Sequence, residues 1–272
     1  MARAGLSACV ITYNEERNLA AALESVAFAE EIIVVDSHSS DGTRDVAESF
    51  ARRHAAGGPR LRLLERDWPG HIEQKNFAVS QAANEWVLSI DADERVSPEL
   101  RQEVEAALSR EDADGYAMPR RTYYLGRWIR RGGWYPDLKL RLFRRSRGKW
   151  GGTNPHDHVD VVGKVRRLRG HIEHLSYRDI AEHVAAINFL TDVAAREKLL
   201  SGVRFPLARM VLHPPSKFLK MYLLQQGFRE GTAGLIVAGL GTLYVFLKYA
   251  KLWELRRTAG GGIPEAPPRP SA

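Results

Sequence analysis

The chain has 272 residues, of which 44% are hydrophobic and 27% are charged, an ordinary balance for a soluble protein that buries a core. This length allows one large domain, or one domain with an appendage. The single cysteine, Cys9, excludes an internal disulfide framework and fits a reducing cytoplasm. The apolar run at the N-terminus is too short for a signal peptide, so we expect a cytoplasmic protein whose first strand lies within residues 1–13.

Strands and helices alternate through the first hundred residues. Short apolar runs predict strands in LSACVITYN, EIIVVDS, RLRLLER and WVLSI, and helical spacing occurs in EERNLAAALESV, RDVAESFARRH and IEQKNFAVSQAAN. After the fourth strand, Ser97 and Pro98 are residue types that cap and begin a helix. Four such units predict an α/β fold with a mostly parallel sheet. Ligands bind such sheets beyond the carboxyl ends of the strands, where Asn14, Asp36 and Asp91 fall.

The pattern changes after residue 115. Short alternating pieces such as LKLRLFRR and DHVDVV predict antiparallel strands that extend the sheet up to residue 175. A helix is expected over residues 178–200, and the chain is helical and apolar from residue 213. The C-terminal end is rich in Gly, Pro and Ala, which predicts disorder. We therefore expect an α/β domain over residues 1–177, a helical region over 178–257 and a disordered tail over 258–272.

Positive charge is concentrated between Pro119 and Lys149. This stretch holds eleven Lys or Arg residues against one acid, Asp137, so its net charge is +10, whereas the other 29 basic and 32 acidic residues give −3. Such a stretch fits nucleic acid, an anionic membrane or a phosphorylated substrate, or it is an ordinary solvated face. Its concentration in one place favours a local partner over general solubility.

The segment from Gly231 to Leu247 contains no charged residue in seventeen positions and is apolar nearly all round. As a helix it would span roughly 25 Å, short of the ~30 Å hydrocarbon core of a bilayer. Lysines, arginines and aromatic residues follow it, as is typical of a membrane interface. We therefore expect contact with a membrane surface; a buried or dimer-forming helix and a true span are the alternatives.

Three carboxylates, Asp91, Asp93 and Glu94, follow the fourth predicted strand within four positions. Their mutual repulsion is unfavourable unless a cation, hydrogen-bond donors or water takes up the charge. Because one residue separates Asp91 from Asp93, a tight turn would aim both side chains at one divalent cation, and carboxylate oxygens suit Mg²⁺ or Mn²⁺. An acidic loop stabilised by the dipole of the next helix is the alternative.

Several stretches occur in a characteristic order along the chain: ACVITYNEERNL, EEIIVVDSHSSDGT, QKNFAVSQAANEWVLSIDADE and LKLRLFRR. In this order they resemble the inverting glycosyltransferases of family 2, which have the GT-A fold. The resemblance covers residues 6 to 257 and is closest to the β-1,4-glucosyltransferase branch of lipopolysaccharide-core biosynthesis. It implies a metal-dependent hexosyltransferase.

The resemblance implies a nucleoside-diphosphate sugar donor, with UDP-glucose as the expected one, across the carboxyl edge of the sheet. Thr12, Asn14 and Glu15 match the first-strand motif that contacts the nucleoside, and Asp36 matches the acid that binds the base or ribose. Lys75, on the helix before the fourth strand, is well placed to meet a phosphate as a point charge.

The same resemblance implies roles for the carboxylates. Asp91 would reach the ribose or the metal, and Asp93 would bind the Mg²⁺ or Mn²⁺ that bridges the diphosphate. His174 matches a histidine that completes the metal site in some members, while a core histidine bonded to the backbone is the alternative. The metal would stabilise the leaving nucleoside diphosphate as charge develops on it.

An inverting transfer also needs a general base to deprotonate the acceptor hydroxyl. In the branch that the chain resembles, a His-Glu pair stands where this sequence has His156 and Asp157, so Asp157 is the expected base although it is one methylene shorter. Asp137 and Glu94 are the other candidates. His156 and His158 also have a spacing that fits zinc, but a structural or surface pair is the more ordinary outcome.

Aromatic residues interrupt the basic stretch, and the faces of five of them could stack on sugar rings while arginines bind phosphate. The five are Tyr123, Tyr124, Trp128, Trp134 and Tyr135. Most of them could equally be core residues. The combination fits an anionic glycolipid or lipopolysaccharide-core acceptor, and we expect the enzyme to be peripheral on the inner face of the cytoplasmic membrane.

Two other functions fit parts of the sequence. A metal-dependent sugar nucleotidyltransferase shares the nucleotide-binding sheet and the metal carboxylates, but it normally has a Gly-rich basic loop after the first strand, which ITYNEERN lacks. A nucleic-acid-binding protein would use the basic stretch, yet this leaves the acids at the strand ends unexplained. We therefore expect no nucleic-acid partner.

Overall fold

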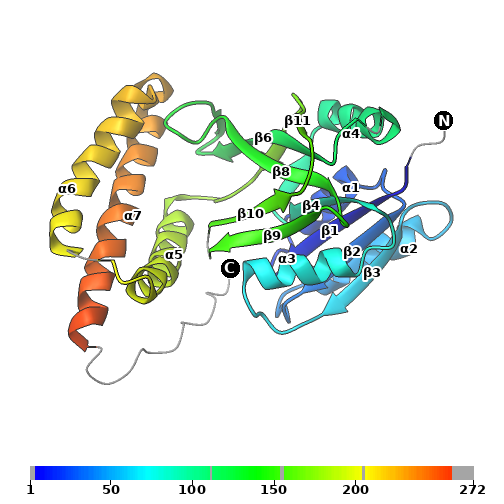
Figure 1. The fold of residues 1–272 in the computed structure, drawn as a ribbon, viewed down its shortest axis with the longest axis horizontal. Coiled ribbons are helices and arrows are strands. Elements are labelled where there is room, and N and C mark those ends of the chain that lie inside the picture. Colours follow the sequence, from blue (N-terminus) through cyan, green and yellow to red (C-terminus); the bar gives the residue numbers. More distant parts are fainter. Residues whose placement is uncertain (1–3, 111, 154–155, 204–205, 259–272) are drawn as a thin grey trace. The chain divides into compact units, whose positions relative to one another are not determined.

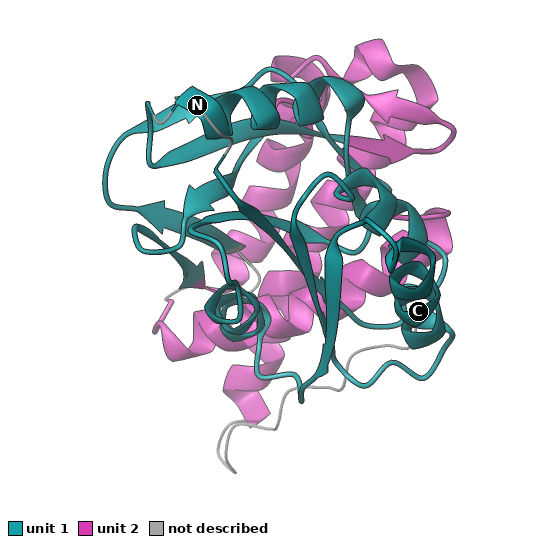
Figure 2. Ribbon diagram, turned by 90° about the vertical axis from the view of Figure 1, so that its right-hand side faces the viewer, with its two compact units in different colours: residues 1–121, 137–152, 156–175 teal, residues 122–136, 153–155, 176–272 magenta. Residues whose placement is uncertain are grey.

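The computed structural model (Figure 1) describes residues 4–110, 112–153, 156–203 and 206–258. The chain divides into two compact units, coloured separately in Figure 2: residues 1–121, 137–152 and 156–175 in unit 1, and residues 122–136, 153–155 and 176–272 in unit 2. Unit 2 thus includes the segment 122–136, which the sequence analysis placed with the α/β domain. Apart from Thr258, which ends the last helix, the predicted tail lies outside the described residues.

Unit 1 is built on four parallel strands in the order β3-β2-β1-β4, which are β1 (Leu6–Thr12), β2 (Glu31–Asp36), β3 (Arg60–Glu65) and β4 (Trp86–Asp91). Both β1 and β2 are buried along their whole length, because both faces of the sheet are covered, and this explains their continuous apolar runs. Side chains of β1 alternate between two cores: Ala8 and Val10 join one, whereas Cys9 and Ile11 join the other.

Helices complete the two cores of unit 1 (Figure 1). The core that contains Val10 also contains residues of α1 (Leu19–Ser25), α2 (Thr43–His54) and α4 (Pro98–Arg110), and the core that contains Cys9 includes residues of α3 (His71–Ser80). The predicted start of α4 is confirmed, because Leu100 N donates to Ser97 Oγ at 3.2 Å and Pro98 is the first helical residue.

Antiparallel strands extend the sheet beyond β4. The sheet continues in the order β8-β6-β12-β5, and β8 is antiparallel to both β4 and β6. A separate two-stranded sheet pairs β9 with β10. The expected α/β fold, with its parallel core and antiparallel extension, is therefore confirmed. The additional strands are β5 (Glu94–Val96), β6 (Gly115–Tyr124), β8 (Asp137–Arg144), β9 (Gly148–Thr153), β10 (His156–Val161), β11 (Val165–Arg167) and β12 (Ile172–His174).

Unit 2 is mainly helical. In it α7 packs against both α5 and α6, and β7 (Arg127–Ile129) pairs with the last residues of β6. The helices are α5 (Ile180–Leu200), α6 (Pro206–Leu219), the π-helical turn η1 (Lys220–Leu224), the 3₁₀ turn η2 (Gly227–Glu230) and α7 (Gly231–Thr258). The predicted helix over 178–200 is confirmed as α5, and the Asp179 side chain caps it by accepting from Glu182 N at 2.8 Å.

The second segment of the helical region begins earlier than predicted. The sequence analysis started it at residue 213, whereas α6 begins at Pro206 and continues through Pro214 and Pro215. These two prolines inside the helix hid its first turns, because proline normally ends a helical pattern. Within the described residues, one helical stretch, 227–258, is long and apolar enough by length and composition to cross a membrane.

An aromatic cluster lies in the core of unit 2. The Tyr124 hydroxyl and His183 Nδ1 are 3.0 Å apart, and the Tyr177 ring stacks on the His183 ring at a centroid distance of 4.2 Å. Burial lowers the pKa of His183 to about 4, so this imidazole is neutral at pH 7. Tyr124 is fully buried, which makes it a core residue of unit 2 and not an exposed stacking surface.

Candidate active site

Three predicted residues stand at one edge of the parallel sheet in unit 1. Thr12 pairs with Asp36 in the register of β1 with β2, and Ile11 pairs with Asp91 in the register of β1 with β4. The carboxyl ends of these strands therefore bring Thr12, Asp36 and Asp91 to the same edge, and the sequence analysis had expected Asn14, Asp36 and Asp91 there. Asn14 lies just beyond β1 with a φ of 54°, a left-handed conformation that asparagine tolerates better than most residues.

Asn14 and Asp36 join the loops that follow β1 and β2. The Asp36 carboxylate accepts from the backbone nitrogen and the hydroxyl of Ser39, at 2.8 and 2.5 Å. Ser39 Oγ accepts from Asn14 N at 2.9 Å, and Asn14 Oδ1 accepts from Ser40 N at 2.8 Å. These hydrogen bonds connect the loop after β1 to the loop after β2 at the edge of the site.

Glu15 and Thr12, at the same edge, differ in their hydrogen bonding. Glu15 N donates to Thr43 Oγ1 at 2.7 Å, and Glu15 Oε2 accepts from Asn18 Nδ2 at 2.8 Å, so this residue ties α1 to the start of α2. Thr12 Oγ1 and Gln74 Oε1 are buried and have no hydrogen-bond partner among the described residues. Buried polar atoms are nearly always satisfied, so these two oxygens indicate a place for a ligand or water.

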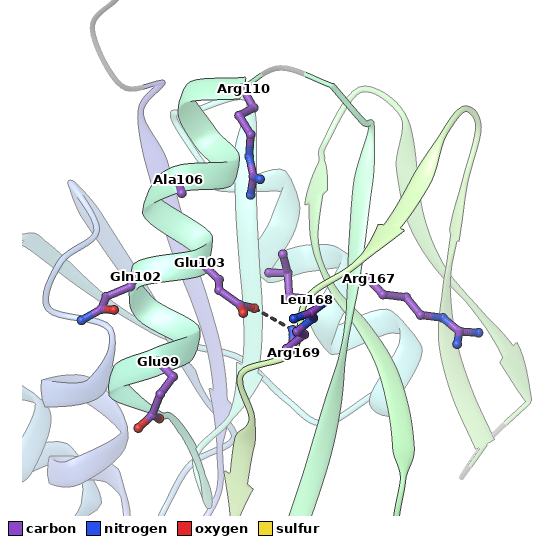
Figure 3. A pocket seen from close by; sticks show the side chains of 8 residues that line it. All are labelled: Glu99, Gln102, Glu103, Ala106, Arg110, Arg167, Leu168 and Arg169. Carbon is purple, nitrogen blue, oxygen red and sulfur yellow. Dashed lines mark hydrogen bonds between the residues drawn. The ribbon is translucent and has the colours of Figure 1, made fainter.

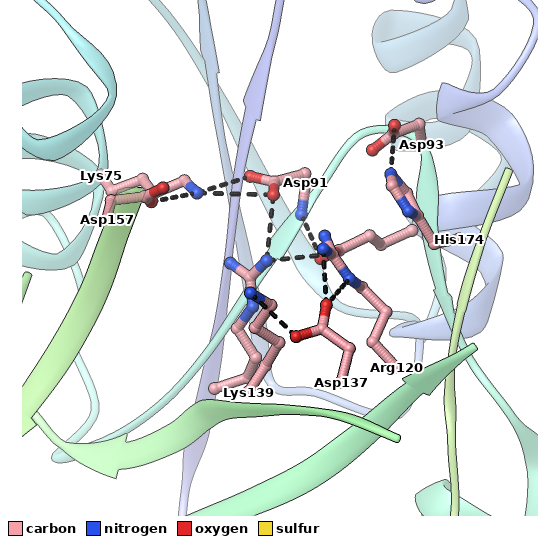
Figure 4. Close-up of polar contacts among 10 residues, drawn as sticks. Lys75, Asp91, Asp93, Arg120, Asp137, Lys139, Asp157 and His174 are labelled. Atoms are coloured by element: carbon pink, nitrogen blue, oxygen red, sulfur yellow. Dashed lines mark hydrogen bonds and ion pairs between the residues drawn. The ribbon is translucent and has the colours of Figure 1, made fainter. Parts of the chain in front are cut away.

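Lys75, on α3, stands between two carboxylates (Figure 4). Its Nζ lies 3.0 Å from Asp91 Oδ1 and 2.7 Å from Asp157 Oδ2, and 4.4 Å from the centre of the Trp150 ring. Only 4% of the Lys75 side chain is exposed. Burial by itself raises the pKa of Asp91 and of Asp157, but Lys75 and then Arg141 outweigh it for Asp91, and Lys75 above all does so for Asp157. Both carboxylates are therefore ionised at neutral pH.

Arg141 and Arg120 form a second charged network beside Lys75. Arg141 Nη2 lies 3.0 Å from Asp91 Oδ2 and 2.9 Å from Glu94 Oε1. Arg120 Nη1 lies 3.0 Å from Glu94 Oε1, and its Nη2 lies 2.7 Å from Asp137 Oδ2. Burial disfavours a charged Arg141, but Glu94 and then Asp91 raise the pKa of its guanidinium above the ordinary value. The network places the buried Arg141 and the partly exposed Arg120 near the edge of the sheet.

Asp93 belongs to a separate pair (Figure 4). Its Oδ2 lies 2.9 Å from His174 Nε2, and Leu175 N donates to the Asp93 carbonyl at 3.0 Å. The antiparallel pairing of β12 with β5 aligns His174 opposite Glu94 and so brings it to the loop after β4. The predicted meeting of a histidine with Asp93 is thus present in the structure.

The predicted set of three metal ligands, Asp91, Asp93 and His174, is not gathered at one point. No group of three or more His, Cys, Asp or Glu side chains suited to a metal occurs within the described ranges. The physical reason is that Asp91 turns to Lys75 and Arg141. Asp91 and Glu94 are thus paired with protein cations, and Asp93 is paired with His174.

Asp93 and His174 nevertheless fit a divalent cation as two neighbouring ligands. Their side chains are 22% and 15% exposed, so both are partly open to solvent. A carboxylate oxygen with an imidazole nitrogen suits Mn²⁺ better than Mg²⁺, which strongly prefers oxygen ligands.

The three candidate bases differ in how firmly they are paired. Glu94 is fully buried within the arginine network. Asp137 accepts from Arg120 Nε at 3.0 Å and Nη2 at 2.7 Å, and it also pairs with Lys139 at 3.2 Å. The ion pair of Asp157 is with Lys75, the residue predicted to bind phosphate. Of the three candidates, Asp157 is therefore the one that a phosphate bound to Lys75 would displace from its ion pair.

Of the histidine pair on β10, the structure describes only the His158 side chain. His158 Nε2 lies 3.2 Å from Asp160 Oδ1, and both residues are exposed, which is typical of a surface ion pair. The side chain of His156 lies outside the described part of the chain. The surface interpretation of His158 is thus the better supported one.

A separate shallow cavity in unit 1 shares no residue with this site (Figure 3). Residues of α4 and the segment 167–169 line it. Glu103 in its wall accepts from the backbone nitrogens of Arg169 at 2.6 Å and Gly170 at 3.1 Å. These bonds tie α4 to the segment before β12, which is a structural role.

The sequence analysis did not single out Arg141 and Arg120 as site residues. Arg141 lies in LKLRLFRR, but the register of β8 with β6 shifts between Leu140 and Leu142, and these two leucines pack in different cores. Alternation along the strand therefore does not place the Arg141 side chain. Arg141 could not be assigned to the site without knowing that β8 pairs with β4.

Comparison with known proteins agrees with this geometry. Two solved structures share the GT-A fold, though at low sequence identity. One is the mannosyltransferase PcManGT of Pyrobaculum calidifontis in complex with GDP-Man and Mn²⁺, with a TM-score of 0.51 and 16% identity, covering 96% of this chain and 77% of that one. The other is TarS 1-349 of S. aureus in complex with UDP-GlcNAc, with a TM-score of 0.50 and 14% identity, covering 93% and 92%. The fold is therefore that of a GT-A transferase.

The family is established by sequence. The profile described as glycosyl transferase family 2 matches residues 7–163, more than half of the chain. The lipopolysaccharide core biosynthesis glycosyltransferase LpsC of Rhizobium meliloti is 32% identical over 257 residues, 92% of each chain. An uncharacterized glycosyltransferase of Rickettsia typhi is 30% identical over 263 residues, covering 92% of this chain and 87% of its own length. The chain belongs to glycosyltransferase family 2, and the predicted glycosyltransferase class is confirmed.

Proposed function

We propose that this glycosyltransferase moves a hexose, with inversion, from a nucleoside-diphosphate sugar to a lipopolysaccharide-core or other lipid-linked acceptor, with UDP-glucose as the first donor to test. The observation that carries the proposal is the pair of buried cations, Lys75 and Arg141, at the carboxyl edge of the sheet. The similarity to LpsC, named for lipopolysaccharide core biosynthesis, supports the acceptor class. Such an acceptor also agrees with a place on the inner face of the cytoplasmic membrane.

The donor would lie along the edge formed by β1, β2 and β4. The partnerless Thr12 Oγ1 offers a hydrogen bond to the nucleoside, and Asp36 stands beside it in register. Arg141 Nε and Nη1 are buried and have no hydrogen-bond partner within the described ranges. A guanidinium with unused donors suits diphosphate oxygens, and the Lys75 ammonium adds a point charge next to it.

Asp93 and His174 would hold the divalent cation of this reaction. A bound Mn²⁺ or Mg²⁺ would supply positive charge that stabilises the leaving nucleoside diphosphate. Asp93 contributes a hard oxygen, and the β12–β5 pairing orients His174 toward it. The two residues thus add to the positive charge that Lys75 and Arg141 provide from the protein.

Asp157 would act as the general base. The acceptor hydroxyl oxygen attacks the anomeric carbon of the donor, the bond from that carbon to the diphosphate oxygen breaks, and Asp157 receives the hydroxyl proton. The electron pair of the broken bond leaves with the nucleoside diphosphate. In the free protein the Lys75 ammonium, 2.7 Å away, lowers the pKa of Asp157 against the opposing effect of burial. A diphosphate that draws Lys75 away would raise this pKa, so donor binding would make Asp157 a stronger base.

The proposal is tested by assaying a panel of nucleotide sugars with delipidated lipopolysaccharide core as the acceptor. We expect release of UDP from UDP-glucose and a product whose new anomeric bond, assigned by NMR, has the configuration opposite to that of the donor. Retained configuration would contradict the assignment of Asp157. Release of pyrophosphate from a nucleoside triphosphate and a sugar phosphate, without glycosyl transfer, would support the nucleotidyltransferase alternative.

A further inference from the structure

The exposed face of α6 and η1 is apolar. Six leucine and valine side chains on these elements are between 51% and 80% exposed, and we call them the α6 stripe: Leu207, Val211, Leu212, Leu219, Leu223 and Leu224. Leu212, Pro215 and Leu219 recur at the three- and four-residue spacing that puts side chains on one helix face. Several large apolar side chains exposed on one helical segment indicate a contact surface, whereas single exposed leucines need no explanation.

The opposite face of α6 is already used by the fold. Pro214 and Met221 are buried, and Met221 shares a core cluster with Val237 and Ala238 of α7. Figure 1 shows α6 (yellow) running alongside α7 (orange). The helix therefore has one face that packs within unit 2 and a second apolar face that does not.

Charge along this segment has one sign. Residues 206–226 contain Arg209, Lys217 and Lys220 and no Asp or Glu. Arg209, His213 and Lys220 follow each other at spacings of four and seven, which places them along one edge beside the α6 stripe. A row of leucines with a basic edge is the pattern of a helix that lies in the interface of an anionic membrane.

We propose that the α6 stripe docks the protein on an anionic lipid bilayer, with α6 and η1 in the plane of the interface. The stripe would enter the boundary between headgroups and acyl chains, and Arg209 and Lys220 would contact lipid phosphates. The sequence analysis expected membrane contact through Gly231–Leu247. In α7, however, Val237 and Val245 pack in the core of unit 2. This inference deepens the proposed function, because it gives a lipid-linked acceptor its membrane, but the binding needs no substrate.

The test is co-sedimentation of the full chain with phosphatidylglycerol–phosphatidylcholine vesicles and with phosphatidylcholine vesicles. The test variant is Leu212→Glu with Leu219→Glu. The control is Leu235→Glu, which puts one glutamate at a 48% exposed leucine of α7 and is compared with Leu212→Glu alone as well as with the double variant. We expect the double variant to lose about tenfold or more in partition to the anionic vesicles, and the control to stay within about twofold of the wild type. A further variant, Arg209→Gln with Lys220→Gln, should lose the preference for anionic lipid.

Three outcomes would overturn the proposal. The double variant would sediment like the wild type, the Leu235→Glu control would lose binding equally, or the wild type would ignore vesicles and form a dimer that the double variant dissolves. The last outcome would make the stripe an interface between two copies. Because these side chains are exposed, melting midpoints should match the wild type and show that the variants fold. Vesicle binding without glycosyl transfer would contradict the proposed function but support membrane docking by the α6 stripe. Glycosyl transfer without vesicle binding would support the proposed function and contradict the docking.

Discussion

Asp157→Asn is expected to reduce turnover by about 10²–10⁴-fold, the range for loss of a general base, while nucleotide binding persists. Asparagine has nearly the same shape and keeps an oxygen that can accept from Lys75, so the site should retain its geometry. What disappears is the carboxylate that receives the acceptor proton. The comparison to make is the initial rate of UDP release at saturating donor, alongside the affinity for UDP.

A control on the same strand separates charge from mechanism. Asp160 lies on β10 and is exposed, paired with His158. Asp160→Asn removes the same charge from the same strand and should turn over at close to the wild-type rate. Full activity of Asp157→Asn would exclude this residue as the base and direct attention to Asp137→Asn.

The second large effect is expected from Lys75→Met, on stability as well as on donor binding. Lys75 is 4% exposed and lies within 3.0 Å of two carboxylates, so its loss leaves Asp91 and Asp157 without their shared cation. Breaking a buried ion pair from one side costs about 3–5 kcal/mol in the free energy of unfolding. Urea unfolding at neutral pH measures this cost. Lys149→Met, at an exposed lysine of β9, is the control and should unfold like the wild type.

The difference in the free energy of unfolding between the wild type and Lys75→Met should depend on pH in a definite direction. The folded-state pKa of Asp91 and of Asp157 lies below the ordinary carboxyl value, chiefly because Lys75 offsets the effect of burial. Their contribution to stability is therefore present above about pH 4 and is lost as the pH falls through the lowered folded values. The gap between wild type and Lys75→Met should be largest at neutral pH and narrow in acid. An equal gap at all pH values would show that lost packing, and not charge, is the cause.

Local sequence patterns predicted the part of the site that depends on strand ends. The apolar runs of β1, β2 and β4 end at Thr12, Asp36 and Asp91, and parallel pairing brings these ends to one edge. The start of α4 could also be predicted, because an N-cap serine followed by proline acts within one turn. Both predictions depend on residues that are close together in the sequence.

The arrangement of charges could not be predicted in the same way. Arg141 reaches Asp91 across fifty positions, and it does so only because β8 pairs antiparallel with β4. Repulsion among the acids after β4 indicated that other groups must take up their charge, but the sequence did not show which; Arg120 and Arg141 pair with Glu94, and His174 pairs with Asp93. Pairing between distant strands depends on the whole sheet, so no local pattern reveals it.

The C-terminal region illustrates the same limit for helices. The uncharged segment of α7 predicted membrane contact, yet residues of this helix such as Val237 and Leu252 are buried in unit 2. More of the exposed large apolar side chains lie on α6 and η1, with six, than on α7, with two, and Pro214 and Pro215 conceal the helical pattern of α6. Hydropathy identifies an apolar segment, but only packing shows which of its faces remains exposed.

The central claim is that the edge formed by Thr12, Lys75 and Asp93 binds a nucleoside diphosphate together with a divalent cation. The most direct measurement is the thermal midpoint with UDP, in Mn²⁺ and in EDTA, for the wild type and Asp93→Asn. A ligand at about 100 times its Kd adds about 2.7 kcal/mol to the stability of the native state. We predict a larger rise of the midpoint with Mn²⁺ than with EDTA, and loss of the Mn²⁺-dependent part in Asp93→Asn. No rise with UDP or GDP, or an Asp93→Asn response equal to that of the wild type, would contradict the claim.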